Sequence, residues 1–207
     1  AVFDVLDGSQ LYMGSIAGNG KGAGVEYECK GDPYWDATNK VTYYWTPTGV
    51  HDFFAYSTYY AGADDNDKNA KYPEKCISFS SEPPYSLTIS DWELSIDEQF
   101  DFLYATHSRS MSEPDPHRPV ELQFQHLLSA VGVSFRNVSP VEYTVTDWYF
   151  RGISNTGTAE IPFGTGTPVI TLSPAQDGPL FEDVDLEGKI QRKKIGQGDG
   201  LYYPYRG

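Results

Sequence analysis

The chain has 207 residues, which suits one sizeable domain or one domain plus part of another. Its 29 acidic and 15 basic residues give a net charge of −14, a sign that repels phosphate backbones and argues against nucleic-acid binding. Frequent tyrosine, glycine and proline, with no sustained helical periodicity, predict an all-β protein of short strands and turns. No apolar run reaches about 18 residues, so no transmembrane helix is predicted.

The first third of the chain contains several segments with strand character. Residues 14–24 are rich in glycine and are predicted to form a flexible hairpin tip or a bulge; a phosphate-binding loop is disfavoured because a strand, not a helix, follows. Residues 61–72 are an acidic loop without the ligand spacing of a helix-loop-helix calcium site, which leaves a looser surface cation site as the alternative to a solvated loop. Strands are expected at 1–6, 25–30, 41–45 and 53–58.

The middle of the chain is organised around residues 119–138. Apolar and polar residues alternate over 120–125 and again over 131–136, which predicts two strands, each with one buried face. Residues 126–130 interrupt this alternation and are too few for a stable helix, so we expect a single helical turn or a tight crossover that plugs the core. Further strands are expected at 85–89 and 99–106, with a proline-rich loop at 108–119.

The last part of the chain is less regular. Strands are expected at 141–145, 148–153 and 169–172, and the short basic cluster at 191–194 is predicted to be a solvated loop. We predict a β-sandwich domain over residues 1–172. Residues 173–207 form a tail that either completes this domain or begins a second β domain.

No pattern of catalytic, cofactor-binding or metal-binding residues stands out. The four histidines (His51, His107, His117 and His126) are scattered, and no nucleophile elbow occurs, so we predict that the protein is not an enzyme and carries no cofactor. His126 opens the expected core-plugging turn and is given a packing or hydrogen-bonding role. Cys29 and Cys76 either form one disulfide or are two buried thiols, and neither belongs to a zinc motif.

Four segments, in the same order, resemble elements of the fimbrillin family of Bacteroidetes. The longest is residues 119–138, with the pattern Val-x-Leu-x-Phe-x-His. The others are residues 43–56, with Tyr-Trp-Thr-Pro and Phe-Ala-Tyr; residues 99–105, with Gln-Phe-Asp-Phe-Leu-Tyr-Ala; and residues 148–158, ending in Asn-Thr-Gly-Thr. The resemblance implies a transthyretin-like β-sandwich of about seven or more mostly antiparallel strands.

The resemblance also implies a function. Family members are fimbrial subunits or adhesins that are exported to the cell outer membrane surface and joined to other fimbrial subunits by donor-strand exchange. In shaft subunits an Arg-specific protease removes the first strand, and a neighbour's C-terminal strand fills the groove. We therefore expect residues 1–11 to border such a groove. Membrane attachment is expected only through a lipid anchor, whose cysteine is not visible in this chain.

Surface ligands are a separate expectation. Host or bacterial surface glycans or proteins are further expected partners of an adhesin. A carbohydrate-binding sandwich remains the alternative function, because exposed aromatic rings stack on sugars. Its candidate residues are Trp35, Trp45, Trp92 and Trp148. Whether the protein is a shaft, tip or anchor subunit is not decided by the sequence.

Overall fold

The structure is a computed structural model. It describes residues 1–29, 35–60, 76–93, 100–128, 130–144, 154, 156–174, 194–195 and 200–206. This part of the chain consists of β-strands, turns and extended segments, and no helix is among its named elements. The prediction of an all-β protein is therefore confirmed.

The larger of two main sheets has five antiparallel strands in the order β11-β10-β7-β1-β2. The longest strand pairing in this sheet is between β7 and β10. Each of these strands has eleven residues, and they pair along their whole length. The strands are β1 (Val2–Leu6), β2 (Gln10–Met13), β7 (Val50–Tyr60), β10 (Phe100–Ser110) and β11 (Gln125–His126).

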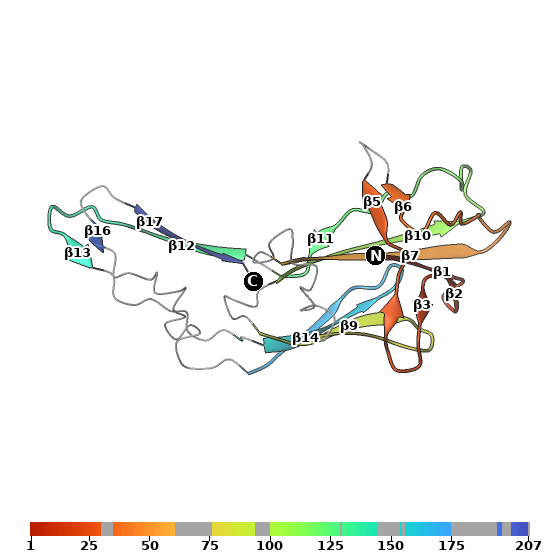
Figure 1. The fold of residues 1–207 in the computed structure, drawn as a ribbon, viewed down its shortest axis with the longest axis horizontal. Coiled ribbons are helices and arrows are strands. Elements are labelled where there is room, and N and C mark those ends of the chain that lie inside the picture. Colours follow the sequence, from red (N-terminus) through yellow and green to blue (C-terminus); the bar gives the residue numbers. More distant parts are fainter. Residues whose placement is uncertain are drawn as a thin grey trace.

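The second main sheet has four antiparallel strands in the order β15-β14-β9-β8. They are β8 (Ile77–Phe79), β9 (Ser86–Glu93), β14 (Thr156–Pro162) and β15 (Val169–Leu172). The two sheets form separate layers (Figure 1). The core between them is built from apolar side chains of both sheets: Phe3, Phe54, Cys76, Phe79, Leu87, Ile89, Phe102, Ala159 and Ile161.

The alternation of side chains explains this packing. In β14, Gly157, Ala159 and Ile161 are buried while the residues between them are more exposed, as expected for a strand with one face in the core. In β7 both faces are buried: Phe54 points into the sandwich, and Phe53 belongs to a second apolar cluster with Met13 and Val25. The five-stranded sheet is thus covered on both sides.

Smaller pairs of strands lie around the sandwich. The hairpin of β3 (Ser15–Ile16) and β4 (Gly22–Ala23) confirms the predicted glycine-rich tip, and β5 (Tyr27–Cys29) pairs with β6 (Trp35–Ala37). β12 (Ala130–Arg136) and β17 (Gly200–Arg206) form a two-stranded ribbon that extends away from the sandwich (Figure 1). Beside it, β13 (Tyr143–Thr144) pairs with β16 (Lys194–Ile195).

The ribbon does not decide whether residues 173–207 complete the sandwich domain or begin a second β domain. β16 and β17 belong to the expected tail, residues 173–207, and both pair with strands from the expected sandwich domain. The division at residue 172 remains a prediction.

Two predicted strands are instead extended arms. Residues 41–45 belong to no strand, and of the strand predicted at 120–125 only Gln125 is paired, as the first residue of β11. Tyr43, Trp45, Val120 and Leu122 nevertheless pack against the second apolar cluster. Alternation predicts a strand paired in a sheet, but an extended segment that lies on the face of a sheet also presents alternate side chains to it.

The predicted helical turn at 126–130 is also absent where the structure describes it. His126 ends β11, residues 127–128 form a bend, and Leu127 and Leu128 pack against the core. This matches the tight crossover that was the alternative. The predicted loop at 61–72 and strand at 148–153 lie outside the described residues.

Candidate functional site

β1 lies inside the larger sheet and is paired on both sides. All five of its residues pair with β7, from Val2 opposite Ala55 to Leu6 opposite His51. On the other side β2 pairs with the second half of β1, and Val2 and Val25 exchange two backbone hydrogen bonds of 2.8 Å. The place between β7 and β2 is therefore filled by the strand that the chain itself supplies.

The inner face of β1 is anchored by Phe3. Its side chain is 0% exposed, and its ring centroid lies 5.1 Å from that of Phe79 and 5.4 Å from that of Phe163. Val5, two residues on, is also buried. Full burial of one such side chain is worth roughly 1.5–3 kcal/mol, so these two residues hold β1 against the core.

The outer face of β1 carries a buried polar pair. Asp4 Oδ2 lies 2.7 Å from Nδ1 of His51, and both side chains are almost fully buried. Nε2 of His51 lies 2.8 Å from the hydroxyl of Thr46, which donates its own proton to the carbonyl of Thr48. The hydroxyl of Thr46 has one proton and gives it to Thr48, so in its contact with His51 it accepts a proton from Nε2. A second proton lies in the hydrogen bond between Nδ1 of His51 and Oδ2 of Asp4.

Asp4 is incompletely satisfied. Its second oxygen, Oδ1, is buried without a hydrogen-bond partner within the described residues. Burial raises the pKa of this carboxyl, against the opposing effect of the His51 hydrogen bond. β1 thus combines strong apolar anchors on one face with a costly carboxyl on the other.

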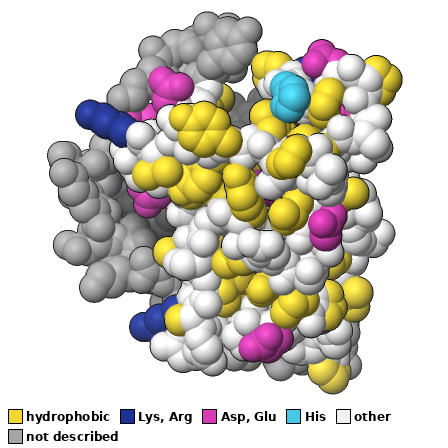
Figure 2. Space-filling model, turned by 90° about the vertical axis from the view of Figure 1, so that its right-hand side faces the viewer, with side chains coloured by type: hydrophobic (Ala, Val, Ile, Leu, Met, Phe, Trp, Pro, Cys, Tyr) yellow, Lys and Arg dark blue, Asp and Glu magenta, His cyan; other side chains and the backbone are white. Residues whose placement is uncertain are grey.

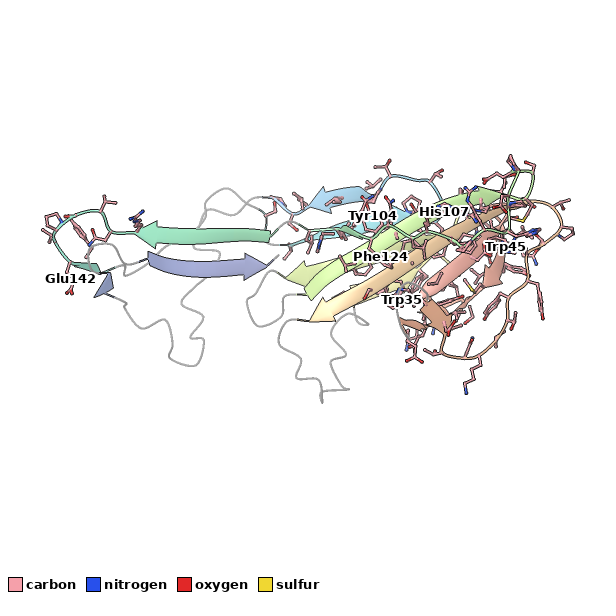
Figure 3. The ribbon with its side chains drawn as sticks, turned by 90° about the horizontal axis from the view of Figure 1, so that it is seen from above. Trp35, Trp45, Tyr104, His107, Phe124 and Glu142 are labelled. Atoms are coloured by element: carbon pink, nitrogen blue, oxygen red, sulfur yellow. The ribbon has the colours of Figure 1, made fainter. Side chains whose placement is uncertain are left out.

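The two extended arms cover the outer face. The Trp45 ring packs edge-on against His51 and Phe53, at centroid distances of 5.2 and 5.8 Å. Seen from above, Trp45, His107 and Phe124 all lie over the five-stranded sheet (Figure 3). The arms therefore bury polar and aromatic groups that would otherwise face water.

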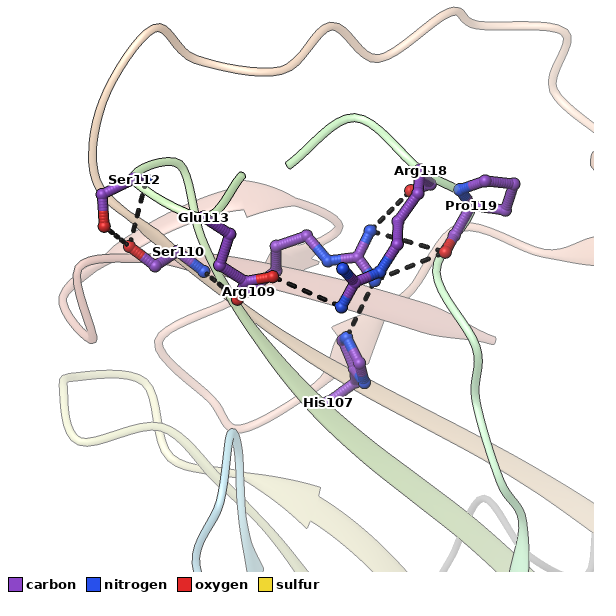
Figure 4. A network of polar contacts seen from close by, with 7 residues as sticks. All are labelled: His107, Arg109, Ser110, Ser112, Glu113, Arg118 and Pro119. Atoms are coloured by element: carbon purple, nitrogen blue, oxygen red, sulfur yellow. Dashed lines mark hydrogen bonds and ion pairs between the residues drawn. The ribbon is translucent and has the colours of Figure 1, made fainter. Parts of the chain in front are cut away.

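Arg109 fastens the second arm to the sheet. Its side chain is 1% exposed, and its guanidinium carbon lies 5.8 Å from the Trp45 ring centroid. The guanidinium donates to the carbonyls of Arg118 and Pro119, at 3.3 and 3.4 Å in the case of Pro119, and to Nε2 of His107 at 3.1 Å (Figure 4). Among the described residues no carboxylate pairs with this buried cation.

The contact with Arg109 sets the state of His107. A guanidinium only donates, so Nε2 of His107 must be the unprotonated acceptor, and the ring is neutral. Burial, and then the nearby charges of Arg109 and Arg118, lower the pKa of His107, while Glu113 and Glu121 oppose this. Glu113 also forms an ion pair with Arg118, at 3.3 Å.

One edge of the smaller sheet is open and apolar. All four residues of β15 are exposed, including Val169 at 62%, Ile170 at 46% and Leu172 at 60%. Within the described part of the chain, only β14 pairs with β15. This strand therefore offers unpaired backbone groups and apolar side chains together, which natural sheet edges usually avoid.

The structure separates the residues predicted from sequence. Trp35 is 61% exposed in β6, Trp45 is half-buried at the end of the first arm, and the side chains of Trp92 and Trp148 lie outside the described residues. Cys76 is buried in the core, whereas the side chain of Cys29 is not described. His126 is exposed, while its neighbours Leu127 and Leu128 pack against the core; the packing or hydrogen-bonding role expected of His126 stays a prediction.

Sequence reasoning missed the two buried polar clusters. A single charged residue inside an apolar strand was the available signal, since Asp4 interrupts Val-Phe-Asp-Val-Leu. His51 is 47 residues away, and nothing local connects the two.

No group of three potential metal ligands and no helix suited to span a membrane occurs in the described ranges. At one end of the sandwich, acidic side chains are spread out among apolar and uncharged ones (Figure 2).

The fold and this site define a β-sandwich with a central, well-anchored first strand and an open sheet edge. A family model described as fimbrillin-like matches residues 6–189. Because the match spans most of the chain, the protein belongs to the fimbrillin-like family, which confirms the resemblance seen in the sequence. No curated protein and no solved structure matches the chain.

Family membership defines the role in outline. Fimbrillin-like proteins are structural subunits, so the chain has the role of an exported fimbrial subunit that assembles with other subunits at the cell surface. The way in which it assembles requires a separate argument from the strands.

Proposed function

We propose that this fimbrial subunit assembles by strand addition and that β1 is the strand that is exchanged. The observation that carries the proposal is the position of β1 between β7 and β2, with Phe3 fully buried against the core. Removal of β1 leaves the edge of β7 unpaired from His51 to Ala55 and opens the space that Phe3 occupies. Such a groove selects an extended strand by backbone hydrogen bonds and alternate side chains.

The outer face of β1 makes exchange favourable. Asp4 keeps one oxygen without a partner in a buried site, which costs free energy in the unexchanged subunit. An incoming strand with an aromatic residue at the Phe3 position and an uncharged hydrogen-bonding residue at the Asp4 position keeps the anchor and avoids that cost. The donor strand is therefore expected to be aromatic at the Phe3 position and uncharged but hydrogen-bonding at the Asp4 position.

Release of β1 requires a cut after it. Lys21 is the first basic residue in the sequence and is exposed in the turn of the β3–β4 hairpin. Arg109 is the first arginine and is buried, so a protease that recognises lysine suits this chain better than one specific for arginine. A cut after Lys21 leaves β1, β2 and β3 on one fragment that is held only by non-covalent contacts.

Limited trypsin treatment tests the proposal. We expect cleavage after Lys21, seen by mass spectrometry, followed by growth into SDS-resistant ladders. Lys21→Gln should block both steps, while Lys40→Gln, which removes another exposed lysine in a turn, should block neither. Cleavage after Lys21 with loss of the fragment but without any association would contradict strand addition at β1.

A carbohydrate-binding role is the second candidate, supported by two exposed aromatic side chains. Trp35 is 61% exposed and Tyr44 is 74% exposed, and such rings stack on sugar faces. Binding on a glycan array that is lost in Trp35→Ala and retained in Lys21→Gln would establish this role independently of assembly. An array without hits would count against it.

A further inference from the structure

The hydrogen-bonding pattern of β15 identifies which backbone groups face outward. Ser173 donates its N–H to the carbonyl of Thr156 at 3.0 Å, and residues of an antiparallel pair alternate between bonded and non-bonded positions. Thr171 and Val169 therefore bond to β14 as well. The N–H and C=O groups of Ile170 and Leu172 point away from the sheet, toward its open edge.

The side chains of the same two residues extend the core face of the sheet. Ile170 lies opposite Ala159, and Leu172 lies opposite Gly157, both of which are buried. Ile170 and Leu172 are nevertheless 46% and 60% exposed. The apolar inner surface of the sandwich therefore continues to an open side.

The segment around β15 is also free of charge. Residues 161–176 contain no Lys, Arg, Asp or Glu, in a chain whose net charge is −14 and in which 21% of residues are charged. Natural sheet edges usually carry charged side chains that oppose pairing. Here two copies of an acidic protein can approach through a neutral strand without like charges at the contact.

We propose that two copies of this chain pair edge to edge through β15, antiparallel about a two-fold axis at Thr171. In this register Ile170 faces Leu172 of the second copy, and the outward N–H and C=O groups of both residues are satisfied. Pro168 and Pro174 have no N–H. A register that places Ile170 opposite itself brings Leu172 opposite Pro168, and one that places Leu172 opposite itself brings Ile170 opposite Pro174, so the register at Thr171 makes the most bonds.

This contact is distinct from exchange of β1. It uses the other sheet, requires no cleavage, and is isologous, so it stops at a dimer. It joins subunits side by side, whereas strand addition joins them in a chain. The two can therefore be tested separately, because one yields a dimer of the uncut protein and the other yields ladders after proteolysis.

A charge swap at Thr171 tests the register. Thr171 is exposed, and the two-fold axis places it beside its own copy, so Thr171→Lys and Thr171→Glu alone each put like charges together. Each variant should raise the dimer dissociation constant by about tenfold or more, and an equimolar mixture should restore dimers at low salt. The measurement is sedimentation velocity of the uncut protein over a range of concentrations. Single variants that dimerise like the wild type would overturn the register.

Proline substitution tests the backbone bonds. Ile170→Pro and Leu172→Pro each remove one outward N–H and leave the bonds to β14 intact, which edge strands tolerate. Both should be monomeric with an unchanged melting temperature, and Ile170→Val, which keeps the N–H and the apolar side chain, should dimerise. A wild-type protein that stays monomeric up to about millimolar concentration would overturn the proposal. Its dimer dissociation constant would then exceed about 1 mM, which corresponds to a binding free energy weaker than about 4 kcal/mol.

Discussion

Nη2 of Arg109 lies 3.1 Å from Nε2 of His107, so a buried cation and a neutral imidazole share one hydrogen bond. This contact joins β10 to the arm at 118–124, because the same guanidinium also binds the carbonyls of Arg118 and Pro119. The arm is thus held on the sheet by a buried cation, whose positive charge is stabilised by backbone carbonyl dipoles and by the Trp45 ring.

Removal of the Arg109 guanidinium should loosen this arm. Arg109→Met leaves the carbonyls of Arg118 and Pro119 without their donor and should lower the free energy of unfolding by about 1–3 kcal/mol, measured by urea denaturation. Hydrogen exchange at residues 120–124 should become faster. Arg118→Met is the control, since it removes only a partly exposed ion pair with Glu113 and should cost less than about 1 kcal/mol. Equal effects of the two substitutions would show that Arg109 does not fasten the arm.

His107 should make stability depend on pH. Its pKa is lower in the folded protein than the ordinary value of 6.5, so the unfolded chain binds the proton first as the pH falls. This contribution to stability is complete above pH 6.5 and is lost below it, toward the lower folded pKa. Protonation also removes the acceptor for Arg109. The measurement is the free energy of unfolding between pH 7.5 and about 5, the range around a histidine pKa.

His107→Gln provides the comparison for the pH experiment. Its amide oxygen can accept from Arg109 but does not titrate, so the decrease below pH 6.5 should be smaller than in the wild type. Identical pH profiles for the two proteins would assign the dependence to other groups.

The Asp4–His51 pair should respond differently to two substitutions. Burial raises the pKa of Asp4 above 3.8, so its contribution to stability is present below pH 3.8 and is lost as the pH rises through the folded pKa. Asp4→Asn cannot ionise and keeps a hydrogen-bonding partner for His51, whereas Asp4→Ala leaves Nδ1 without one. At pH 7 the Asn variant should be more stable than the Ala variant by about 1–3 kcal/mol. An Ala variant as stable as the Asn variant would show that the bond to His51 contributes nothing.

A larger residue at position 22 should destabilise the protein, because Gly22 packs closely against the ring of Phe79 in the core. A Cβ atom there would lie 2.5 Å from the Phe79 ring, and Gly20, in the same hairpin, accepts a hydrogen bond from the Phe79 N–H at 2.8 Å. Gly22→Ala should therefore destabilise the protein by about 1–3 kcal/mol, seen as a lower melting temperature. Gly18→Ala is the matched control, since a Cβ there meets nothing within 4 Å. A destabilisation equal to that of the control would mean that the hairpin shifts freely.

Local alternation predicted most strands of the sandwich but not their roles. Segments 53–58 and 169–172 lie within β7 and β15, and residues 100–106 of the segment predicted at 99–106 lie within β10. The same period-two pattern at 41–45 and 119–124 belongs to arms, because alternation reports which side chains are buried and not whether the backbone pairs. The partners of a strand are non-local, and so they are invisible to a local pattern.

The sequence by itself determined the all-β class, the absence of a helical pattern, the uncharged stretch around 161–176 and the family. These properties follow from composition and from motifs that lie within a few residues of one another. Only the tertiary structure decided that β1 is internal, that β15 is an edge strand among the described strands, and that Asp4 contacts His51, 47 residues away. Edges and buried polar contacts depend on which distant segments pack together, and the free energy of that packing is a property of the whole fold.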